Sequence, residues 1–526
     1  MCSDPCVATY SWVGASRFCR GKFISGESHV LVNDSTTSRL YALVFIRTFK
    51  EKGQLYAYIY QIVTMPYLYP KSPFKHDSEI RSELQNEMLR LIGHVDDKVF
   101  KDVQARLDSL CSWLCTTPKT TTFRVNNLVT DTEAVVKEIA KELSQIGRPF
   151  EVSTNPYFPE LISVSCWDSS VELNLHYLPK EIIVDSICGT AVLRGAHVFA
   201  PGVMGIPQGL RVGDMVSVYA DLTGDCKKGF NKRYMSPHKV FLGNGVLRIT
   251  RNELFGGTVK RPSGIAVFMT DVVSRLPSLS DSVLSKGSAL LQNLPSIICS
   301  RVLNPSSDEI ILDMCAAPGN KTTHISALMK GSGTIVALEK IKSKVERMRI
   351  QCNELCATNI QIFCFDSTKA VSEVKEKIFS DGPPYNVESF DRILLDVPCS
   401  ALGQRPQLTN AITVAQINSY VPLQRKLFSA AVRLLKFGGV LVYSTCTITA
   451  GENEGIVSWA LKTYPYLRLE PVRKKLCSLG LPHIGASGMD ISGLTSEESK
   501  NLCRFGVESD SVGFFIACFV KINAET

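Results

Sequence analysis

Residues 309–323, which read EIILDMCAAPGNKTT, decide the fold predicted for the C-terminal half of this chain. The segment passes from an apolar run typical of a buried strand, through a turn of small residues, to a stretch able to begin a helix. Gly319 can adopt a positive φ angle, and the following helix offers unpaired amide groups in its first turn. The loop matches neither the spaced-glycine dinucleotide fingerprint nor a phosphate-binding P-loop. It therefore predicts a ligand site of another kind.

The same alternation of strand and helix continues toward the C-terminus. Strands are expected at 309–314, 334–339, 359–364, 392–397, 440–445 and 512–520, and helices at 321–330, 340–356, 416–436 and 453–463. This pattern predicts a doubly wound α/β sheet with helices on both faces. In such a sheet, ligands bind outside the carboxyl ends of the strands.

Acidic residues stand at three successive strand ends. Glu339 ends the second strand, Asp366 follows the third and Asp396 ends the fourth. Glu339 is placed to accept both hydroxyls of a ribose, as in other nucleotide-type sites, and Asp366 to accept from an adenine amino group. One such acid is often a turn or cap residue. Three in succession predict a nucleoside site.

Two cysteines also follow strand-like runs, so both are expected to face one crevice. Cys399 lies in DVPC (396–399) and Cys446 in YSTCT (443–447). A pyrimidine must be attacked at carbon 6 before carbon 5 can accept a methyl group. One thiol can form that bond, and the second can help to break it. The pair predicts covalent methylation of a pyrimidine, whereas the alternative is that they are ordinary buried thiols among the 18 cysteines of the chain.

Zinc is the competing explanation for the cysteines. Cys111 and Cys115 are four apart, as are Cys352 and Cys356, which is the spacing of one helix face. The chain has no Cys-x-x-Cys pair of the kind that structural zinc sites use. We therefore expect these pairs to pack within helices, and no metal site.

The composition is that of an ordinary globular protein. A length of 526 residues predicts about three domains. The net charge of +8 is compatible with a phosphate-bearing partner but does not establish one, because the basic residues are scattered. No run reaches the roughly 20 apolar residues that span a bilayer, and no signal peptide is expected. We expect a monomeric cytoplasmic protein with no membrane partner and reduced thiols.

Changes in sequence character divide the chain into four expected segments. These are an N-terminal extension with no functional interpretation (1–77), an α/β subdomain with a helical start (78–178), a small β-barrel (179–272) and the doubly wound domain (273–526). The extension holds β-prone runs at 40–46 and 55–65. Short runs at 182–184, 191–193, 215–219 and 239–242, separated by glycines, are the expected barrel strands.

Taken together, these patterns resemble a known family. Residues 316–319 (AAPG), 396–399 (DVPC) and 444–446 (STC) resemble the Sun-type (NSUN) RNA cytosine-5 methyltransferases. Residues 191–202 (AVLRGAHVFAPG) are similar to the PUA domain that one branch of that family carries. The stretches FLGNG (241–245) and GQRP (403–406) strengthen the match, which covers about 78–521. The resemblance implies a Rossmann-like class I methyltransferase domain and a PUA RNA-binding domain.

The resemblance also implies catalytic roles. Cys446 would attack carbon 6 of cytosine, and Cys399 would assist removal of the carbon 5 proton and elimination of Cys446. The DNA enzymes use the other cysteine as nucleophile, and sequence spacing alone does not choose between the two orders. Asp396 would hold the cytosine, and Lys321 would add electrostatic support near the reacting centre.

The implied cofactor is S-adenosylmethionine. Its expected contacts are Cys315, Ala316, Ala317, Pro318, Gly319, Asn320, Lys321, Glu339 at the ribose, Lys344 nearby, Asp366 at the adenine, and Asp396. Three positions depart from the family pattern. Asn320 replaces a glycine, Glu339 replaces an aspartate, and Ala401-Leu402 replaces Gly-Met.

The implied partner is RNA, with cytosine near the CCA end of tRNA and CUCCA-like sites in mRNA as substrates. An unpaired or terminal cytosine is favoured because the base must leave its stack. The expected RNA contacts are Arg194, His197, Phe199, Lys227, Lys228 and Asn244. Phe199 is expected either to stack on a base or to belong to the barrel core.

Two other hypotheses stay open. The departures at Asn320 and Glu339 are compatible with an RNA-binding protein that has lost turnover and acts through its PUA domain. A methyltransferase for protein or small molecules is the second alternative, but it leaves the paired cysteines and the barrel unexplained.

Overall fold

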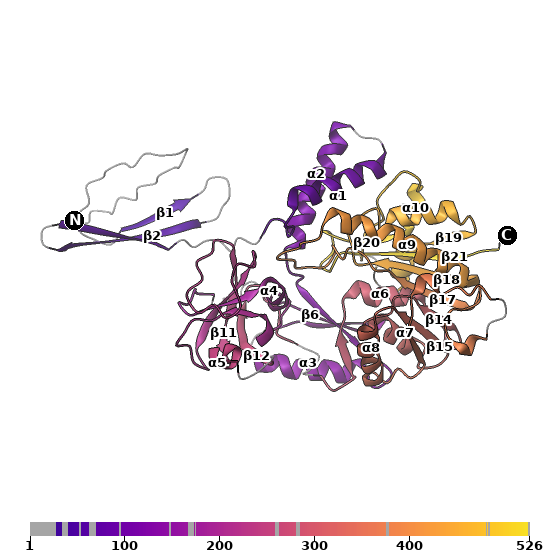
Figure 1. The fold of residues 1–526 in the computed structure, drawn as a ribbon, viewed down its shortest axis with the longest axis horizontal. Helices are drawn as coiled ribbons and strands as arrows, with labels where there is room; N and C mark the ends of the chain where they lie inside the picture. The colour runs from indigo at the N-terminus through magenta and orange to yellow at the C-terminus, as the bar shows by residue number, and fades with distance from the viewer. Residues whose placement is uncertain are drawn as a thin grey trace. The chain divides into compact units, whose positions relative to one another are not determined.

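The computed structural model (Figure 1) describes residues 28–33, 40–51, 54–62, 70–93, 96–146, 149–166, 173, 175–257, 262–279, 284–374, 378–479, 481 and 484–523. The chain forms two compact units, a first unit of Met1–Tyr69 and a main unit of Pro70–Thr526.

The first unit contains an antiparallel sheet. Its strands are β1 (Ser28–Asn33), β2 (Leu40–Glu51) and β3 (Gln54–Ile62), in the order β1-β2-β3. The β-prone runs expected at 40–46 and 55–65 fall in β2 and β3, except that 63–65 lie outside the described residues.

The main unit opens with two helices, α1 (Asp77–Ile92) and α2 (Asp97–Leu114). The Asp96 side chain accepts from the Val99 amide at 2.7 Å and caps α2. The buried faces of both helices pack on Leu402 and Ile448, which belong to the loops that follow the two candidate cysteines. The N-terminal helices thus cover the site from one side.

The expected boundary at residue 77 lies earlier. Asn410 donates its amide to the Pro73 carbonyl at 2.6 Å, and its own carbonyl accepts from Lys75 at 2.8 Å. Because these bonds tie 70–77 to the main unit, the compact first unit ends at Tyr69.

A four-stranded antiparallel sheet follows, covered on one face by α3 (Thr132–Ile146). Its strands, in the order β13-β4-β6-β5, are β4 (Thr120–Val125), β5 (Val152–Asn155), β6 (Phe158–Ser165) and β13 (Ala289–Leu291). Side chains of α3 pack against Phe123 and Ile162. Strand β13 comes from beyond the expected boundary at 273, so this subdomain is built from two stretches of chain.

Residues 181–272 form a six-stranded sheet in the order β8-β12-β11-β10-β7-β9. Its elements are β7 (Glu181–Asp185), α4 (Ser186–Leu193), β8 (Val198–Phe199), η1 (Ala200–Gly202), β9 (Val203–Gly205), β10 (Met215–Asp221), β11 (Lys239–Leu247), α5 (Arg251–Phe255) and β12 (Ile265–Val272). In a flat sheet the edge strands β8 and β9 would be about 24 Å apart. The chain from Phe199 to Val203 spans at most about 14 Å, so the sheet must curl, as a small barrel does.

One predicted barrel strand is wrong. Residues 191–193, expected as a strand, form the last turn of α4. Asp185 caps this helix by accepting from the Cys188 amide at 2.7 Å. The helix packs closely on β10, because a Cβ atom at Gly189 would lie 2.6 Å from the Cβ of Ala220. The cap at Asp185 and the close packing on β10 therefore outweigh the strand preference of this apolar run.

The C-terminal domain is built on an eight-stranded mixed sheet. Its strands are β14 (Ile310–Asp313), β15 (Thr334–Glu339), β16 (Ile360–Cys364), β17 (Phe390–Asp396), β18 (Leu435–Thr445), β19 (Leu467–Glu470), β20 (Cys503–Phe505) and β21 (Phe514–Lys521). The order is β16-β15-β14-β17-β18-β21-β19, with β20 beside β21. The first five strands are parallel, and β21 is antiparallel to β18.

Helices cover both faces of this sheet, which confirms the predicted doubly wound architecture (Figure 1). They are α6 (Leu294–Leu303), α7 (Asn320–Leu328), α8 (Lys342–Glu354), α9 (Val414–Leu434), α10 (Glu454–Thr463), α11 (Val472–Ser478) and α12 (Ser496–Asn501), with short turns η3 (Ser367–Lys369) and η4 (Phe379–Asp381). Side chains of α6, α7 and α11 share one core with the sheet, and those of α9 and α10 share the core on the other face.

Among the described residues, no helix is both long and apolar enough to cross a membrane. His, Cys, Asp and Glu side chains in the same ranges do not gather in threes to form a metal site. Cys111 and Cys352 are buried on α2 and α8, and Cys115 is buried at the C-cap of α2. The expected packing is wrong for Cys356, which is exposed two residues beyond the end of α8.

Candidate active site

The candidate site lies at the carboxyl ends of two neighbouring parallel strands. Asp396 at the end of β17 is in register with Ser444 near the end of β18, and the Val397 amide donates to the Ser444 carbonyl at 3.2 Å. This register brings the following loops together, and the Sγ atoms of Cys399 and Cys446 lie 3.3 Å apart. The structure therefore brings together the two thiols that the sequence singled out.

The two thiols differ in their ionisation. The hydrogen bond from Cys399 lowers the pKa of Cys446, against the effect of burial, and Gln404 and Lys321 lower it further. The same bond, together with burial, raises the pKa of Cys399 well above its usual range. Of the two thiols, Cys446 therefore ionises more readily, and Cys399 keeps its proton and can donate to the Cys446 thiolate when that forms.

A half-buried ion pair stands beside the thiols. Lys321 Nζ, in the first turn of α7, lies 2.7 Å from Asp396 Oδ2, and Ser444 Oγ donates to Asp396 Oδ1 at 2.6 Å. Burial lowers the pKa of Lys321, but the Asp396 carboxylate outweighs it and the pKa is raised. The ammonium group also lies 5.2 Å from the centroid of the Phe514 ring. Lys321 is thus held as a cation next to Cys446.

The strand-end carboxylates surround one point at the end of β14. Burial is the main reason that the pKa of the Cys315 thiol is raised, and the charges of Asp313, Asp396, Glu339 and Asp366 raise it further. Four carboxyl groups thus lie within range of one thiol, and two of them, Asp396 and Asp366, are paired with Lys321 and Lys340. Such an environment, lined by a close backbone loop, fits a cationic nucleoside such as S-adenosylmethionine.

The predicted loop has the close packing that its small residues suggested. The Ala316 amide donates to the Leu338 carbonyl at 3.0 Å, which ties the loop to β15. Gly319 has a φ of +109° at the start of α7, and a Cβ atom there would lie 3.0 Å from Met348 Cγ. Asn320, which stands where the family has glycine, accepts from Gln351 Nε2 at 2.5 Å. Asparagine is therefore accommodated by a partner on α8.

The remaining cofactor candidates lie around this loop. Glu339 Oε1 accepts from the Ile341 amide at 2.8 Å. Asp366 pairs with Lys340 at 2.9 Å, which is the main reason that its pKa is lowered. Ala317 is half-buried and Pro318 is exposed, while Lys344 points outward from the first turn of α8.

Four of the six RNA-contact candidates are exposed on the curled sheet. They are Arg194, Phe199, Lys227 and Lys228. The Phe199 side chain is 51% exposed, so the alternative that it belongs to the barrel core is wrong. Lys228 Nζ donates to the Pro201 carbonyl at 3.3 Å. This contact places Lys228 beside the turn that carries Phe199.

The other two candidates are engaged within the protein. Asn244 is 1% exposed, and its amide accepts from Ser217 Oγ at 2.8 Å and donates to the His176 carbonyl at 2.9 Å. The expectation that Asn244 contacts RNA is corrected, because it is a structural residue of the sheet. His197 is half-buried, and its Nδ1 accepts from the Met269 amide at 3.1 Å. Only its other ring nitrogen remains for a ligand.

The sequence reasoning missed four residues of the site. Ser444 and Gln404 bond directly to the catalytic candidates, and Phe514 lies against Lys321. Glu452 is buried between the two cysteine loops. The sequence offered one sign of two of these residues: Gln404 stands five positions after Cys399, and Glu452 stands six after Cys446. Only tertiary contacts distinguish such polar residues from ordinary surface residues.

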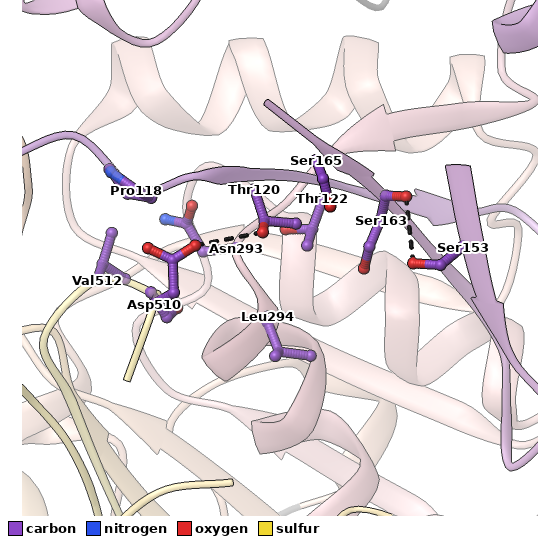
Figure 2. A pocket seen from close by; sticks show the side chains of 11 residues that line it. Pro118, Thr120, Thr122, Ser153, Ser163, Ser165, Asn293, Leu294, Asp510 and Val512 are labelled. Atoms are coloured by element: carbon purple, nitrogen blue, oxygen red, sulfur yellow. Dashed lines mark hydrogen bonds between the residues drawn. The ribbon is translucent and has the colours of Figure 1, made fainter. Parts of the chain in front are cut away.

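Two cavities lie outside the thiol site. One, of about 270 Å³, is on the sheet face away from α3 and is lined by hydroxyl groups, among them Thr120, Thr122 and Ser163, with Asp510 at its edge (Figure 2). The other, of about 550 Å³, is lined by residues between Lys286 and Leu291, by Asn320, and by residues between Arg347 and Leu355. Neither is lined by Cys399 or Cys446.

Known proteins are similar to this chain over most of its length. The family model described as 16S rRNA methyltransferase RsmB/F matches residues 300–517. The tRNA (cytosine(72)-C(5))-methyltransferase NSUN6 of Mus musculus is 39% identical over 487 residues, which cover 87% of this chain and 98% of that protein. The protein of the same name from Homo sapiens is 42% identical over 453 residues, which cover 81% and 93%.

A solved structure agrees with these relatives. The crystal structure of NSun6 from Pyrococcus horikoshii with SFG has a TM-score of 0.62 and 27% sequence identity, and the match covers 87% of this chain and all of that one. The mixed sheet described above is thus that of a class I methyltransferase. On the extent of these matches and the geometry of the site, the chain belongs to the S-adenosylmethionine-dependent RNA (cytosine-C5)-methyltransferases, in the family that includes the NSUN6 proteins.

Proposed function

We propose that the chain methylates carbon 5 of a cytosine near the 3′ acceptor end of tRNA, through a covalent bond between Cys446 and the base. The observation that carries this proposal is the 3.3 Å approach of Cys399 and Cys446, with their pKa values displaced in opposite directions. The substrate is supported by the mouse and human relatives, whose names specify cytosine 72 of tRNA.

Cys446 begins the reaction. Its thiolate adds to carbon 6, so that an S–C bond forms while the electron pair of the C5=C6 double bond moves to carbon 5. S-adenosylmethionine, when bound, supplies the methyl group that carbon 5 takes up, and the electron pair of the broken S–CH₃ bond stays on its sulfur. Lys321 and Asp396 lie where charge develops in this step, and Asp396 is proposed to hold the amino group or ring nitrogen 3 of the cytosine.

Cys399 completes the reaction. Adduct formation removes the hydrogen bond with Cys446, the largest cause of the raised pKa of Cys399, together with the charge of Cys446. Cys399 then releases its proton to solvent and takes the proton from carbon 5. The electron pair of that C–H bond restores the C5=C6 double bond and expels Cys446 as a thiolate. Both thiols return to their starting states, and one proton has been released in the cycle.

The cofactor contacts form part of the same proposal. The backbone of 315–320 would line the cofactor, Glu339 would accept its ribose hydroxyls, and Asp366 would meet the adenine. Lys344, exposed in the first turn of α8, would contact it nearby. The carboxyl groups gathered around Cys315 support a ligand that carries hydroxyl and amino groups and a positive charge.

The curled sheet is proposed as a PUA domain that grips the CCA end. Phe199 would stack on a base, and Lys228 and Arg194 would contact phosphates. Unpaired CUCCA-like sites in mRNA are proposed as further substrates, because the target base must leave its stack. We place the reaction in the cytoplasm.

The test uses labelled S-adenosylmethionine and tRNA transcripts with an intact CCA end. Wild type is expected to transfer label, C446A to transfer none, and C399A to accumulate an RNA adduct that survives denaturant. C356A, which removes an exposed cysteine just beyond α8, is the matched control and should behave as wild type. A short CUCCA-containing mRNA run alongside tests the second substrate.

Two results would change the proposal. An adduct that persists in C446A would reverse the roles of the thiols. If the wild-type protein binds RNA tightly but transfers label to none of the RNAs, the alternative of an RNA-binding protein that acts through the curled sheet is favoured.

A further inference from the structure

Glu452 is a buried carboxyl group between the two cysteine loops. It lies six residues beyond Cys446, just before α10, and is 1% exposed. Its Oε2 accepts from the Ser400 amide at 3.0 Å and from Gln424 Nε2 at 2.8 Å. Its Oε1 accepts from Ser400 Oγ at 2.5 Å and from Thr449 Oγ1 at 2.8 Å. Both oxygens are therefore committed to fixed donors.

These donors belong to both loops that carry the thiols. Ser400 directly follows Cys399, and Thr449 lies three residues after Cys446. Gln424 on α9 uses the same amide nitrogen to donate to the Pro398 carbonyl at 3.1 Å, so it fixes the residue before Cys399 as well. Glu452 is thus the common acceptor through which the two loops hold each other.

Further bonds make the link rigid. Ser400 Oγ lies 2.6 Å from Thr447 Oγ1, which joins the loops a second time beside Glu452. The Glu452 carbonyl accepts from Tyr443 OH at 2.6 Å, so its backbone is anchored to β18. A small shift of Glu452 would therefore move Cys399 relative to Cys446.

Glu454, two residues later, is a buried carboxyl group with a different set of partners, so burial alone does not explain why Glu452 is held by donors from both thiol loops. It is also fully buried, but it pairs with Arg504 at 2.6 Å and accepts from the Met489 amide. Glu452 is held by neutral donors, with no such cationic partner among its contacts in the described residues. A buried carboxyl group without a cation is costly and persists where its donors are well placed.

We propose that Glu452 is a positioning residue that sets the approach of the two thiols and reserves Cys399 for the release of the product. This inference rests on the proposed two-cysteine reaction and adds to it the residue that assigns the roles. The charge of Glu452 contributes, after the Cys446 hydrogen bond and burial, to raising the pKa of Cys399. Lys321 acts in the opposite sense on Cys446, so the two charges polarise the pair.

The test measures two steps in the full-length protein with a CCA-ended tRNA transcript. The turnover rate is measured from the transfer of labelled methyl groups to the tRNA. The fraction of enzyme held in the denaturant-resistant adduct is measured on a gel at steady state. E452Q is expected to slow turnover by about 10–100-fold, as misplacement of a reacting group does, and to raise the adduct fraction toward that of C399A. S400A keeps Glu452 but removes one of its donors. It should also slow turnover and raise the adduct fraction, each by less than E452Q does.

The matched control is E454Q, which removes an equally buried carboxylate whose own side-chain partners, Arg504 and the Met489 amide, lie outside the thiol loops. It should lower the melting temperature without raising the adduct fraction. A parallel fall of turnover and adduct in E452Q, as in a merely destabilised protein, would overturn the inference. If E452Q does not fold, S400A decides by the same criterion.

The same gel distinguishes failure of this inference from failure of the proposed function. If C399A forms no adduct, the two-cysteine reaction itself is wrong. If C399A accumulates adduct while E452Q and S400A keep the wild-type fraction, only the role of Glu452 is wrong.

Discussion

Lys321 Nζ and Asp396 Oδ2 lie 2.7 Å apart and join the first turn of α7 to the end of β17. The two residues are 75 positions apart in the chain, and each follows a different strand of the same sheet. Their contact places one cation and one carboxylate beside the Cys446 thiol. The ion pair therefore connects the loop proposed for the cofactor with the loops that carry the reacting thiols.

Removing the cation should affect chemistry more than substrate binding. For K321M we expect the single-turnover rate of methylation to fall about 10²–10³-fold, the usual effect of losing one positioned charge. The tRNA dissociation constant, measured by filter binding, should stay near that of wild type. K137A removes an exposed lysine of α3 and is the control. A loss of tRNA affinity with unchanged chemistry would contradict this role.

The ionisation of Cys446 should depend on its neighbour. C399A removes the hydrogen bond that stabilises the Cys446 thiolate, so the pKa of Cys446 should rise. Thiolate is the reactive form, and the alkylation rate of Cys446 by iodoacetamide should therefore shift to higher pH and fall at pH 7. Mass spectrometry of the Cys446 peptide gives the rate. An unchanged pH profile in C399A would show that the thiol pair does not share a proton.

Asp313 should make stability depend on pH. Burial raises its pKa to about 7, and the Asp396 charge adds to this, whereas the unfolded value is about 3.9. Between these values the unfolded chain releases the proton and the folded chain keeps it, so folded-state stability falls as pH rises from about 4 to about 7. D313N should abolish this loss and be more stable than wild type at pH 8, by on the order of 3–4 kcal/mol.

Urea denaturation at pH 5 and pH 8 checks this expectation. The gain of D313N over wild type should be larger at pH 8 than at pH 5. An equal difference at both values would mean that Asp313 does not titrate in this range.

The curled sheet should contribute two kinds of RNA contact. F199A is expected to weaken tRNA binding by about 1–3 kcal/mol, the value of one stacked base, without changing the salt dependence. K228A should lower the slope of log affinity against log salt by about 1, as loss of one phosphate contact does. Titrations at several salt concentrations separate the two effects. If neither variant changes tRNA affinity, this surface is not the RNA site.

Much of the fold followed from local pattern. The strands that became β14 to β18 and the helices α7 to α10 show hydropathy periods that neighbouring residues set by themselves. The antiparallel direction of β21 was not predicted, because strand direction depends on which neighbour the strand pairs with. The helix at 191–193 was missed, because its cap at Asp185 and its packing on Ala220 are not visible in an apolar run.

The candidate site divides in the same way. Cys399, Cys446 and Asp396 were found from the sequence, because each stands at or just beyond a strand end, and the topology of the sheet gathers such positions at one edge. Lys321 was expected only from the family resemblance. Asn244 was misplaced and Glu452 was overlooked. In both cases burial, which depends on distant parts of the chain, decided the role of the side chain.

The sequence by itself determined the α/β class of the C-terminal domain, the place of its ligand edge and the presence of two thiols there. Only the tertiary structure decided which thiol ionises, which carboxylates surround Cys315 and which side chains of the curled sheet reach solvent. The physical reason is the range of the forces involved. Helices and strands are indicated by hydropathy patterns among residues a few positions apart. In contrast, pKa values and burial are set by charges and neighbours that the fold brings from far along the chain.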